Sequence, residues 1–237
     1  MCGRMTQVTD PAEVARIFDS ESAIDSDTGE AEPRYNVAPT QPLTVVTQRA
    51  DEGRLVEQQR WGLVPSFAKS LKEGAKRINA RAETVATSPA FRSSFARRRC
   101  IVPSDGFYEW RRTGGPTQPY FLHPPQRTVL AMAGIWSVWK DPQTELWVPS
   151  AAVITTEANR LMSRIHDRMP VLLPREAWDD WLDPATDDRD YLQSLLAPAP
   201  DDVLGMYPIS TRVNTVRNEG PELIEAVPEP EQLGLED

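Results

Sequence analysis

The sequence lacks any apolar run of about 18 residues, the length that a membrane-spanning helix needs. Its first residues are too polar for a secretory signal peptide. It has only two cysteines, Cys2 and Cys100, which is too few for a disulfide framework and without the spacing of a metal site. We therefore expect a cytoplasmic protein with no membrane partner, no metal and no cofactor, and we expect Cys100 to be a buried core thiol.

The chain does have enough apolar residues for one sizeable core, with 40% hydrophobic residues and seven Trp in 237 residues. Nothing in it marks a linker between two folding units, and 22 Pro indicate many loops and short strands. We predict a monomer with a single domain over residues 1–220. An acidic tail rich in Pro and Glu is predicted over residues 221–237.

Short β-rich runs outnumber helical ones and do not alternate with them regularly. This predicts an α+β fold with a mainly antiparallel, barrel-like sheet and flanking short helices. Strands are expected over residues 43–47, 55–61, 100–102, 107–110, 120–122, 129–138 and 147–155. Helices are expected over residues 11–19, 88–94, 157–163, 174–182 and 189–196, and an exposed acidic loop over residues 20–33.

The net charge of −9 argues against a nucleic-acid partner, because DNA binding depends on cations that neutralise phosphates. The charges are unevenly distributed, however. Residues 77–112 carry eight arginines against three acidic residues. This stretch predicts a basic face able to meet DNA, although a solvated arginine surface explains the same charges equally well.

Cys2 follows the initiator methionine directly. Removal of Met1 would give a first residue that carries an α-amine and a thiol on adjacent carbons. Such a pair reacts with aldehydes, because the amine forms an imine on which the thiol closes a five-membered thiazolidine ring. The alternative is a small residue that stands at this position by chance.

Four further residues have side chains suited to catalysis or DNA binding. Glu109 stands among aromatic residues, where desolvation raises a carboxyl pKa and suits the group to proton transfer. Asn79 and Arg81 project to the same side of an extended segment, as an amide for a sugar oxygen and a guanidinium for a phosphate. His166 lies in a polar cluster between two elements, whereas His123, before two prolines, is interpreted as structural. Capping or ion pairing explains each of these residues as well.

Taken together, blocks of sequence along most of the chain closely resemble the SRAP (SOS response-associated peptidase) family. The blocks are Met1–Arg4, Arg34–Thr40, Arg60–Pro65, Asn79–Thr84, Pro103–Trp110, Ala133–Trp136 and Ile165–Pro170. The resemblance implies a DNA damage response protein that binds single-stranded DNA at abasic sites and links itself covalently to them. It also implies loss of Met1, by self-cleavage or by an aminopeptidase, and a lyase-like reversal of the link. Bound to DNA, such a protein would be nucleoid-associated.

The resemblance also implies residue roles. Cys2 would be the nucleophile and Asn79 would orient the opened sugar, while Glu109 moves protons and His166 assists at the sugar hydroxyl and in reversal. Residues implied near the DNA are Arg4, Arg81, Arg92, Thr155 and Arg168. One departure is that Phe67 and Ala68 stand where bacterial relatives have two aromatic residues, which puts the recognition of DNA junctions in doubt.

Two rival functions stay open. A peptidase or amidohydrolase acting in trans could use Cys2 with His166 and Glu109 as nucleophile, base and orienting group. A noncatalytic single-strand binding module would leave Cys2 without a chemical role.

Overall fold

The fold centres on a closed barrel of five strands, in a computed structural model that describes residues 2–24, 32–49, 53–111, 117–126 and 128–229. The barrel strands are β4 (Pro42–Arg49), β5 (Gly53–Trp61), β7 (Arg99–Ser104), β10 (Leu130–Lys140) and β11 (Trp147–Glu157). β5, β4, β7, β10 and β11 pair antiparallel in that order, and a parallel pairing of β11 with β5 closes the ring. The expected α+β fold with a mainly antiparallel, barrel-like sheet is confirmed.

Three short strands extend the barrel. β6 (Asn79–Arg81) and β12 (Arg168–Pro170) pair with β11, and β2 (Glu21–Ser22) pairs with β5. The β2 pairing corrects part of the loop expected over residues 20–33, of which residues 25–31 lie outside the described residues.

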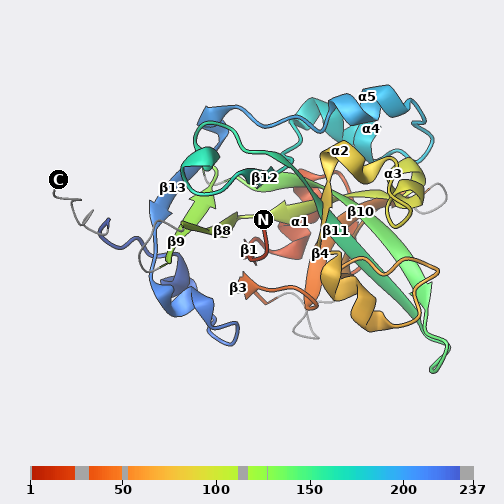
Figure 1. Cartoon of the computed structure of the whole chain (residues 1–237), viewed down its shortest axis with the longest axis horizontal. Coiled ribbons are helices and arrows are strands. Elements are labelled where there is room, and N and C mark those ends of the chain that lie inside the picture. Colours follow the sequence, from red (N-terminus) through yellow and green to blue (C-terminus); the bar gives the residue numbers. More distant parts are fainter. Residues whose placement is uncertain (1, 25–31, 50–52, 112–116, 127, 230–237) are drawn as a thin grey trace, which may run out of the picture.

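A second sheet of five strands lies beside the barrel. Its strands, in spatial order, are β13 (Gly205–Pro208), β9 (Gln118–His123), β8 (Gly106–Arg111), β1 (Met5–Gln7) and β3 (Arg34–Val37). In Figure 1, β1 lies near the middle of the view, close to β8 and β4. The chain therefore starts at the centre of the molecule.

The barrel strands bury a different hydrophobic cluster on each face, because successive side chains of a strand point to opposite sides. Ile101 belongs to the cluster that the helices cover, together with Phe18, Trp178 and Trp181. Its neighbours Cys100 and Val102 belong to the cluster that the second sheet covers, with Cys2, Met5, Phe107 and Leu122. Cys2 is thus part of the core between barrel and sheet.

The helices are short, and all but the first gather on one side of the barrel (Figure 1). They are α1 (Pro11–Ile17), α2 (Ala82–Val85), α3 (Arg92–Arg97), α4 (Trp178–Leu182) and α5 (Arg189–Ser194), with 3-10 turns at Leu71–Lys76, Met162–Arg164, Arg175–Ala177, Asp201–Val203, Thr211–Asn214 and Pro221–Ile224. α1 begins as predicted, with the Asp10 carboxylate accepting from the Ala12 N–H. The helices predicted over residues 174–182 and 189–196 are also found, in shortened form.

Two helix predictions need correction. The helix expected over residues 88–94 begins only at Arg92. The helix expected over residues 157–163 is wrong, because β11 continues to Glu157 to pair with β12. The Asn159 side chain then accepts from the Met162 N–H, which starts a 3-10 turn instead.

Arg99, one of the eight arginines of the basic stretch, is buried and does not reach the surface. Its guanidinium donates to five backbone carbonyls, those of Phe95, Ala96, Trp181, Asp183 and Thr186. These carbonyls lie in and just after α3 and α4, where helices leave carbonyl groups without intrahelical partners. Arg99 therefore joins two helix ends to the barrel and is not part of a basic face.

The segment predicted as a tail is packed at its beginning. Leu223 is buried, the Val227 N–H donates to the Pro208 carbonyl, and the Tyr120 hydroxyl donates to Glu229. The domain boundary at residue 220 stays a prediction, and residues 230–237 lie outside the described residues. Among the residues that the structure describes, no helix is long and apolar enough to cross a membrane.

Candidate functional site

Cys2 is fully buried immediately before β1, the strand that pairs with both β8 and β3. Its carbonyl accepts a hydrogen bond of 2.8 Å from Asn79 Nδ2, and its sulfur is reached by a backbone hydrogen bond from Arg4. Burial raises the pKa of the Cys2 thiol far above its usual range, and the nearby Glu109 carboxylate raises it further. At neutral pH this thiol therefore keeps its proton.

Asn79 is the first residue of β6, whose parallel pairing with β11 sets Asn79 beside Val153. One end of its amide holds the Cys2 carbonyl. The other end, Oδ1, is buried and has no hydrogen-bond partner in the part of the chain that the structure describes. An acceptor left in this state can receive a hydroxyl group of a ligand.

Glu109 lies on β8 opposite Tyr120 and is only 3% exposed. Desolvation raises the pKa of the Glu109 carboxyl, and positive charge on nearby His166 opposes that rise. The structure therefore brings Glu109 within electrostatic range of both Cys2 and His166. A raised pKa makes this carboxylate a stronger base than an ordinary glutamate.

His166 lies between the 3-10 turn Met162–Arg164 and β12. Its Nδ1 is 3.0 Å from the Arg168 backbone nitrogen and 2.8 Å from Asp167 Oδ1. A neutral ring cannot use one nitrogen for both. The backbone N–H is a fixed donor, whereas the Asp167 side chain is largely exposed, so Nδ1 accepts from Arg168. The proton of the neutral ring then lies on Nε2.

An open pocket of about 580 Å³ connects Glu109 and His166 to solvent. It is lined by Arg4, Glu109, Trp110, Thr117, Ile165, His166 and Asn214. The volume is sufficient for a sugar phosphate with flanking groups. The predicted catalytic residues Glu109 and His166 share this pocket, and Cys2 and Asn79 are joined to each other by a hydrogen bond next to Glu109.

Arg4 is half-buried at the pocket wall. Its Nη1 donates to Asn36 Oδ1 and to the Val213 carbonyl, both at 2.7 Å, and the guanidinium lies over the Trp110 ring. The sequence pattern predicted no role for Asn36. In the structure Asn36 is buried and ties Arg4 to the 213–218 segment, since its Nδ2 donates to carbonyls there. Its position in the block Arg34–Thr40 was the available signal.

Arg168 forms a bidentate pair with Glu83, at 2.5 and 2.9 Å, and also donates to the Thr155 carbonyl. This pairing lowers the pKa of the Glu83 carboxyl. Thr155 itself is fully buried, and its place near the DNA stays a prediction. Its carbonyl accepts from the Arg168 guanidinium and so positions Arg168.

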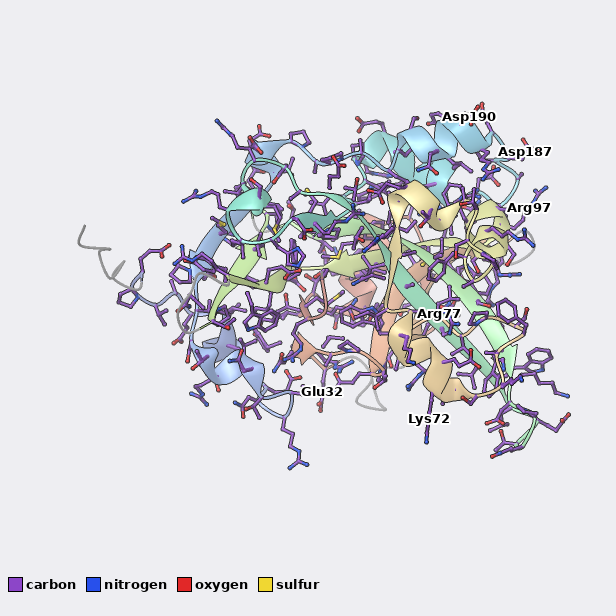
Figure 2. The ribbon with its side chains drawn as sticks, viewed as in Figure 1. Glu32, Lys72, Arg77, Arg97, Asp187 and Asp190 are labelled. Carbon is purple, nitrogen blue, oxygen red and sulfur yellow. The ribbon has the colours of Figure 1, made fainter. Side chains whose placement is uncertain are left out.

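The remaining predicted DNA residues are exposed but not all near the pocket. Arg81 ends β6, two residues from Asn79. Arg92 begins α3 and lines a different pocket with Arg97, Asp187, Arg189 and others. Figure 2 shows Arg97, Asp187 and Asp190 at one end of the molecule, so charges of both signs meet there. Phe67 is 63% exposed, whereas Ala68 is buried.

Elsewhere, His123 packs against Phe121 and Tyr207, in agreement with a structural role. Within the described ranges no three His, Cys, Asp or Glu residues gather in a way that could hold a metal ion.

Comparisons with known proteins give one consistent answer. The chain is 40% identical over 227 residues to "Abasic site processing protein YoqW" of Bacillus subtilis, covering 95% of this chain and all of that protein. It is 34% identical over 226 residues to "Abasic site processing protein HMCES" of Gallus gallus, covering 83% of this chain and 67% of that protein. A solved structure from Bacteroides thetaiotaomicron, 26% identical, superposes with a TM-score of 0.85 over 95% of this chain and all of the other. The family model for SOS response associated peptidase (SRAP) matches residues 1–216, and the chain therefore belongs to the SRAP family.

Proposed function

We propose that this protein processes abasic sites in single-stranded DNA by attaching Cys2 covalently to the ring-opened sugar, which shields the lesion. The observation that carries the proposal is the placement of Cys2. A residue so near the chain start would ordinarily be poorly ordered, yet it is fully buried and tied to Asn79, beside Glu109. The relatives named for abasic site processing supply the target.

The proposed reaction begins once Met1 has been removed, a hydrolysis that consumes one water. The α-amine of Cys2 adds to the aldehyde carbon of the opened sugar, and loss of one water gives an imine. The sulfur then bonds to the same carbon while the thiol proton passes to the nitrogen. The product is a thiazolidine, formed with net loss of one water and no change in oxidation state.

Each neighbour has a task in this sequence. Because the Cys2 thiol holds its proton tightly, ring closure needs a base, and Glu109 is the adjacent carboxylate with a raised pKa. Asn79 Oδ1 accepts a hydroxyl of the opened sugar. His166, with its Nε2 proton, serves at the sugar oxygen during ring opening and during lyase-like reversal.

The strand would follow the arginines around the pocket. Arg4 lines the pocket, while Arg81 and Arg168 come from β6 and β12, which both pair with β11. A phosphate at Arg168 would join or displace the Glu83 carboxylate, which now holds the guanidinium. Arg92, lining a separate pocket, would meet only a longer strand.

The pKa of the Cys2 thiol also distinguishes the proposed function from the rival hydrolase function. Cysteine hydrolases activate their nucleophile as a thiolate of lowered pKa. Burial raises the pKa of Cys2 instead, which favours chemistry that the amine starts and the thiol completes. A noncatalytic binding module would have no use for the buried Cys2, Asn79 and Glu109 group.

Intact mass spectrometry tests the proposal. Protein lacking Met1 is incubated with an oligonucleotide carrying one abasic site, and with a matched oligonucleotide carrying a tetrahydrofuran analogue that has no aldehyde. We expect a heat-stable species heavier by the abasic oligonucleotide less one water, and no adduct with the analogue. An absence of adduct from fully processed protein would overturn the proposal, and peptide hydrolysis in trans would support the rival.

A further inference from the structure

The lysines of this protein are concentrated in one place. The chain has four, Lys69, Lys72, Lys76 and Lys140, and the other basic residues are arginines spread over the whole sequence. Three of the four lie on the segment 69–76, which includes the 3-10 turn Leu71–Lys76. In a protein of net charge −9, such an arrangement makes this segment a local region of positive charge.

These three lysines are exposed. Lys69, Lys72 and Lys76 form no ion pair with any carboxylate of the described residues. The one acidic residue of the segment, Glu73, is bonded to Arg77 and to the backbone N–H of Lys69. Lys140 differs, because it pairs with Glu145. Figure 2 shows Lys72 projecting away from the ribbon at the edge of the molecule.

The segment is held firmly on the barrel. The Trp139 indole donates to the Ala68 carbonyl at 2.8 Å, and the Leu63 N–H donates to the Arg77 carbonyl. Gly74 lies so close to Gly62 that an added Cβ would come within 2.4 Å of the Gly62 carbonyl oxygen. The three ammonium groups therefore extend from a fixed base.

This base leads directly into the proposed lesion site. Lys76 precedes Asn79 by three residues, so their Cα atoms are at most about 11 Å apart. Lys72 and Lys76 are separated by about 8 Å along a 3-10 turn, roughly two phosphate steps of a stacked strand. A strand whose abasic sugar lies beside Asn79 can thus continue over the lysines.

We propose that Lys69, Lys72 and Lys76 form a phosphate-binding surface for the DNA that flanks the lesion. The inference rests on the proposed function and adds a contact for undamaged nucleotides. A lysine is a mobile point charge without the fixed fork of an arginine. It contacts phosphates without reading sequence, which suits a protein that must accept any flanking sequence.

The test compares wild type with the triple variant Lys69→Gln, Lys72→Gln, Lys76→Gln. Binding to a 15-nucleotide strand with a central tetrahydrofuran analogue, which forms no covalent bond, is measured from 50 to 200 mM salt. A plot of log K against log salt has a negative slope, and loss of three phosphate contacts should make that slope less steep by about 2. The fourfold rise in salt would then weaken wild type roughly 16-fold more than the variant. Lys140→Gln, a lysine already paired with a carboxylate, should leave the slope unchanged.

The rate of adduct formation separates this inference from the proposed function. On a trinucleotide with a central aldehydic abasic site, wild type and triple variant should react equally, whereas on the 15-nucleotide strand the variant should be slower. Failure to form an adduct on either substrate would overturn the proposed function. The salt dependence of binding would still test whether the three lysines contact phosphates. An unchanged slope in the triple glutamine variant would overturn the inference. It would do so even if the lysine segment were then found to bind an acidic protein, because the proposed ligand is DNA. Equal loss of binding in the triple Lys→Arg variant would also overturn it, because that variant keeps the charge.

Discussion

The two cysteines are equally buried, but the residues around them differ. Cys2 and Cys100 are both fully buried, burial raises the pKa of both thiols, and each is near a carboxylate, Glu109 or Glu57. Cys100, however, is in mid-barrel, opposite Gly134 on one side and Thr47 on the other. Burial and thiol acidity therefore cannot identify a reactive cysteine here.

The difference lies in the backbone and the space around each thiol. The Cys100 carbonyl accepts from the Trp181 indole, and a Cβ placed on Gly134 would come within 2.8 Å of the Cys100 sulfur. No aldehyde fits there. The Cys2 carbonyl accepts a hydrogen bond from the Asn79 amide. The nearby Glu109 carboxylate lines a pocket that is open to solvent. What distinguishes Cys2 is its place just before β1, beside Asn79 and beside a carboxylate, Glu109, that lines an open pocket.

The largest expected effect comes from exchanging each sulfur for oxygen. Cys2→Ser should form no heat-stable adduct with an abasic oligonucleotide, because thiazolidine closure needs the thiol. Cys100→Ser should retain the wild-type yield, as measured by denaturing gel after heating. Equal yields from the two variants would show that the contrast between the cysteines is mistaken.

Replacement of the carboxylate beside Cys2 should have the next largest effect. Glu109→Gln should slow adduct formation by about 10² to 10⁴, the usual contribution of general acid–base catalysis. Affinity for the tetrahydrofuran analogue should change little. The matched control is Glu57→Gln beside Cys100, which should leave the rate as in wild type. A parallel fall in rate and affinity would assign Glu109 to structure.

Loss of the amide on the Cys2 carbonyl should be milder. Asn79→Ala removes the 2.8 Å hydrogen bond and the proposed sugar acceptor, together about 1 to 3 kcal/mol, or roughly 5- to 160-fold in rate. Single-turnover kinetics on a short abasic oligonucleotide give the rate. Gln48→Ala, which alters an amide bonded to Arg54 and away from the site, controls for general damage, and an equal slowing in that variant would refute the specific role.

The raised pKa of Glu109 makes a prediction about stability. A carboxyl whose pKa is higher in the folded state stabilises the fold below its unfolded pKa of about 4.3, and that contribution is lost as pH rises through the folded value. The stability of wild type relative to Glu109→Gln should therefore fall as the pH rises from about 4 towards neutrality. Thermal melts of both proteins across this range measure it, and a constant difference would contradict the raised pKa.

The smallest effect is expected at Cys100. Cys100→Ala leaves a small cavity between β4 and β10 and should cost about 1 to 2 kcal/mol in the free energy of unfolding, with no change in adduct yield. Denaturant unfolding measures the cost. Reduced yield at full stability would mean that the two cysteine regions are coupled.

Much of the fold could be predicted from the sequence, because long β-rich runs such as those of β5, β10 and β11 carry a clear pattern. Strands of three residues do not, and so β1, β6 and β12 were missed. These three carry or border Cys2, Asn79 and His166. Their formation depends on pairing with distant strands, which local pattern does not report.

The site residues came from resemblance more than from pattern, and the structure brings four of them together. Partners were harder to predict. Arg99 was counted as a surface cation, yet it binds five carbonyls in the interior, and Arg168 is already paired with Glu83. A list of charges gives no information on which carbonyls or carboxylates the fold sets beside them.

The burial of Cys2 has a consequence for the order of events during synthesis. Residues 60–61 must find residues 150–151 before the barrel can close, and pairing over such separations is slow. The proposed function requires that Met1 be removed. Slow closure would then leave a kinetic window in which an aminopeptidase could act, before β1 pairs with β8 and β3.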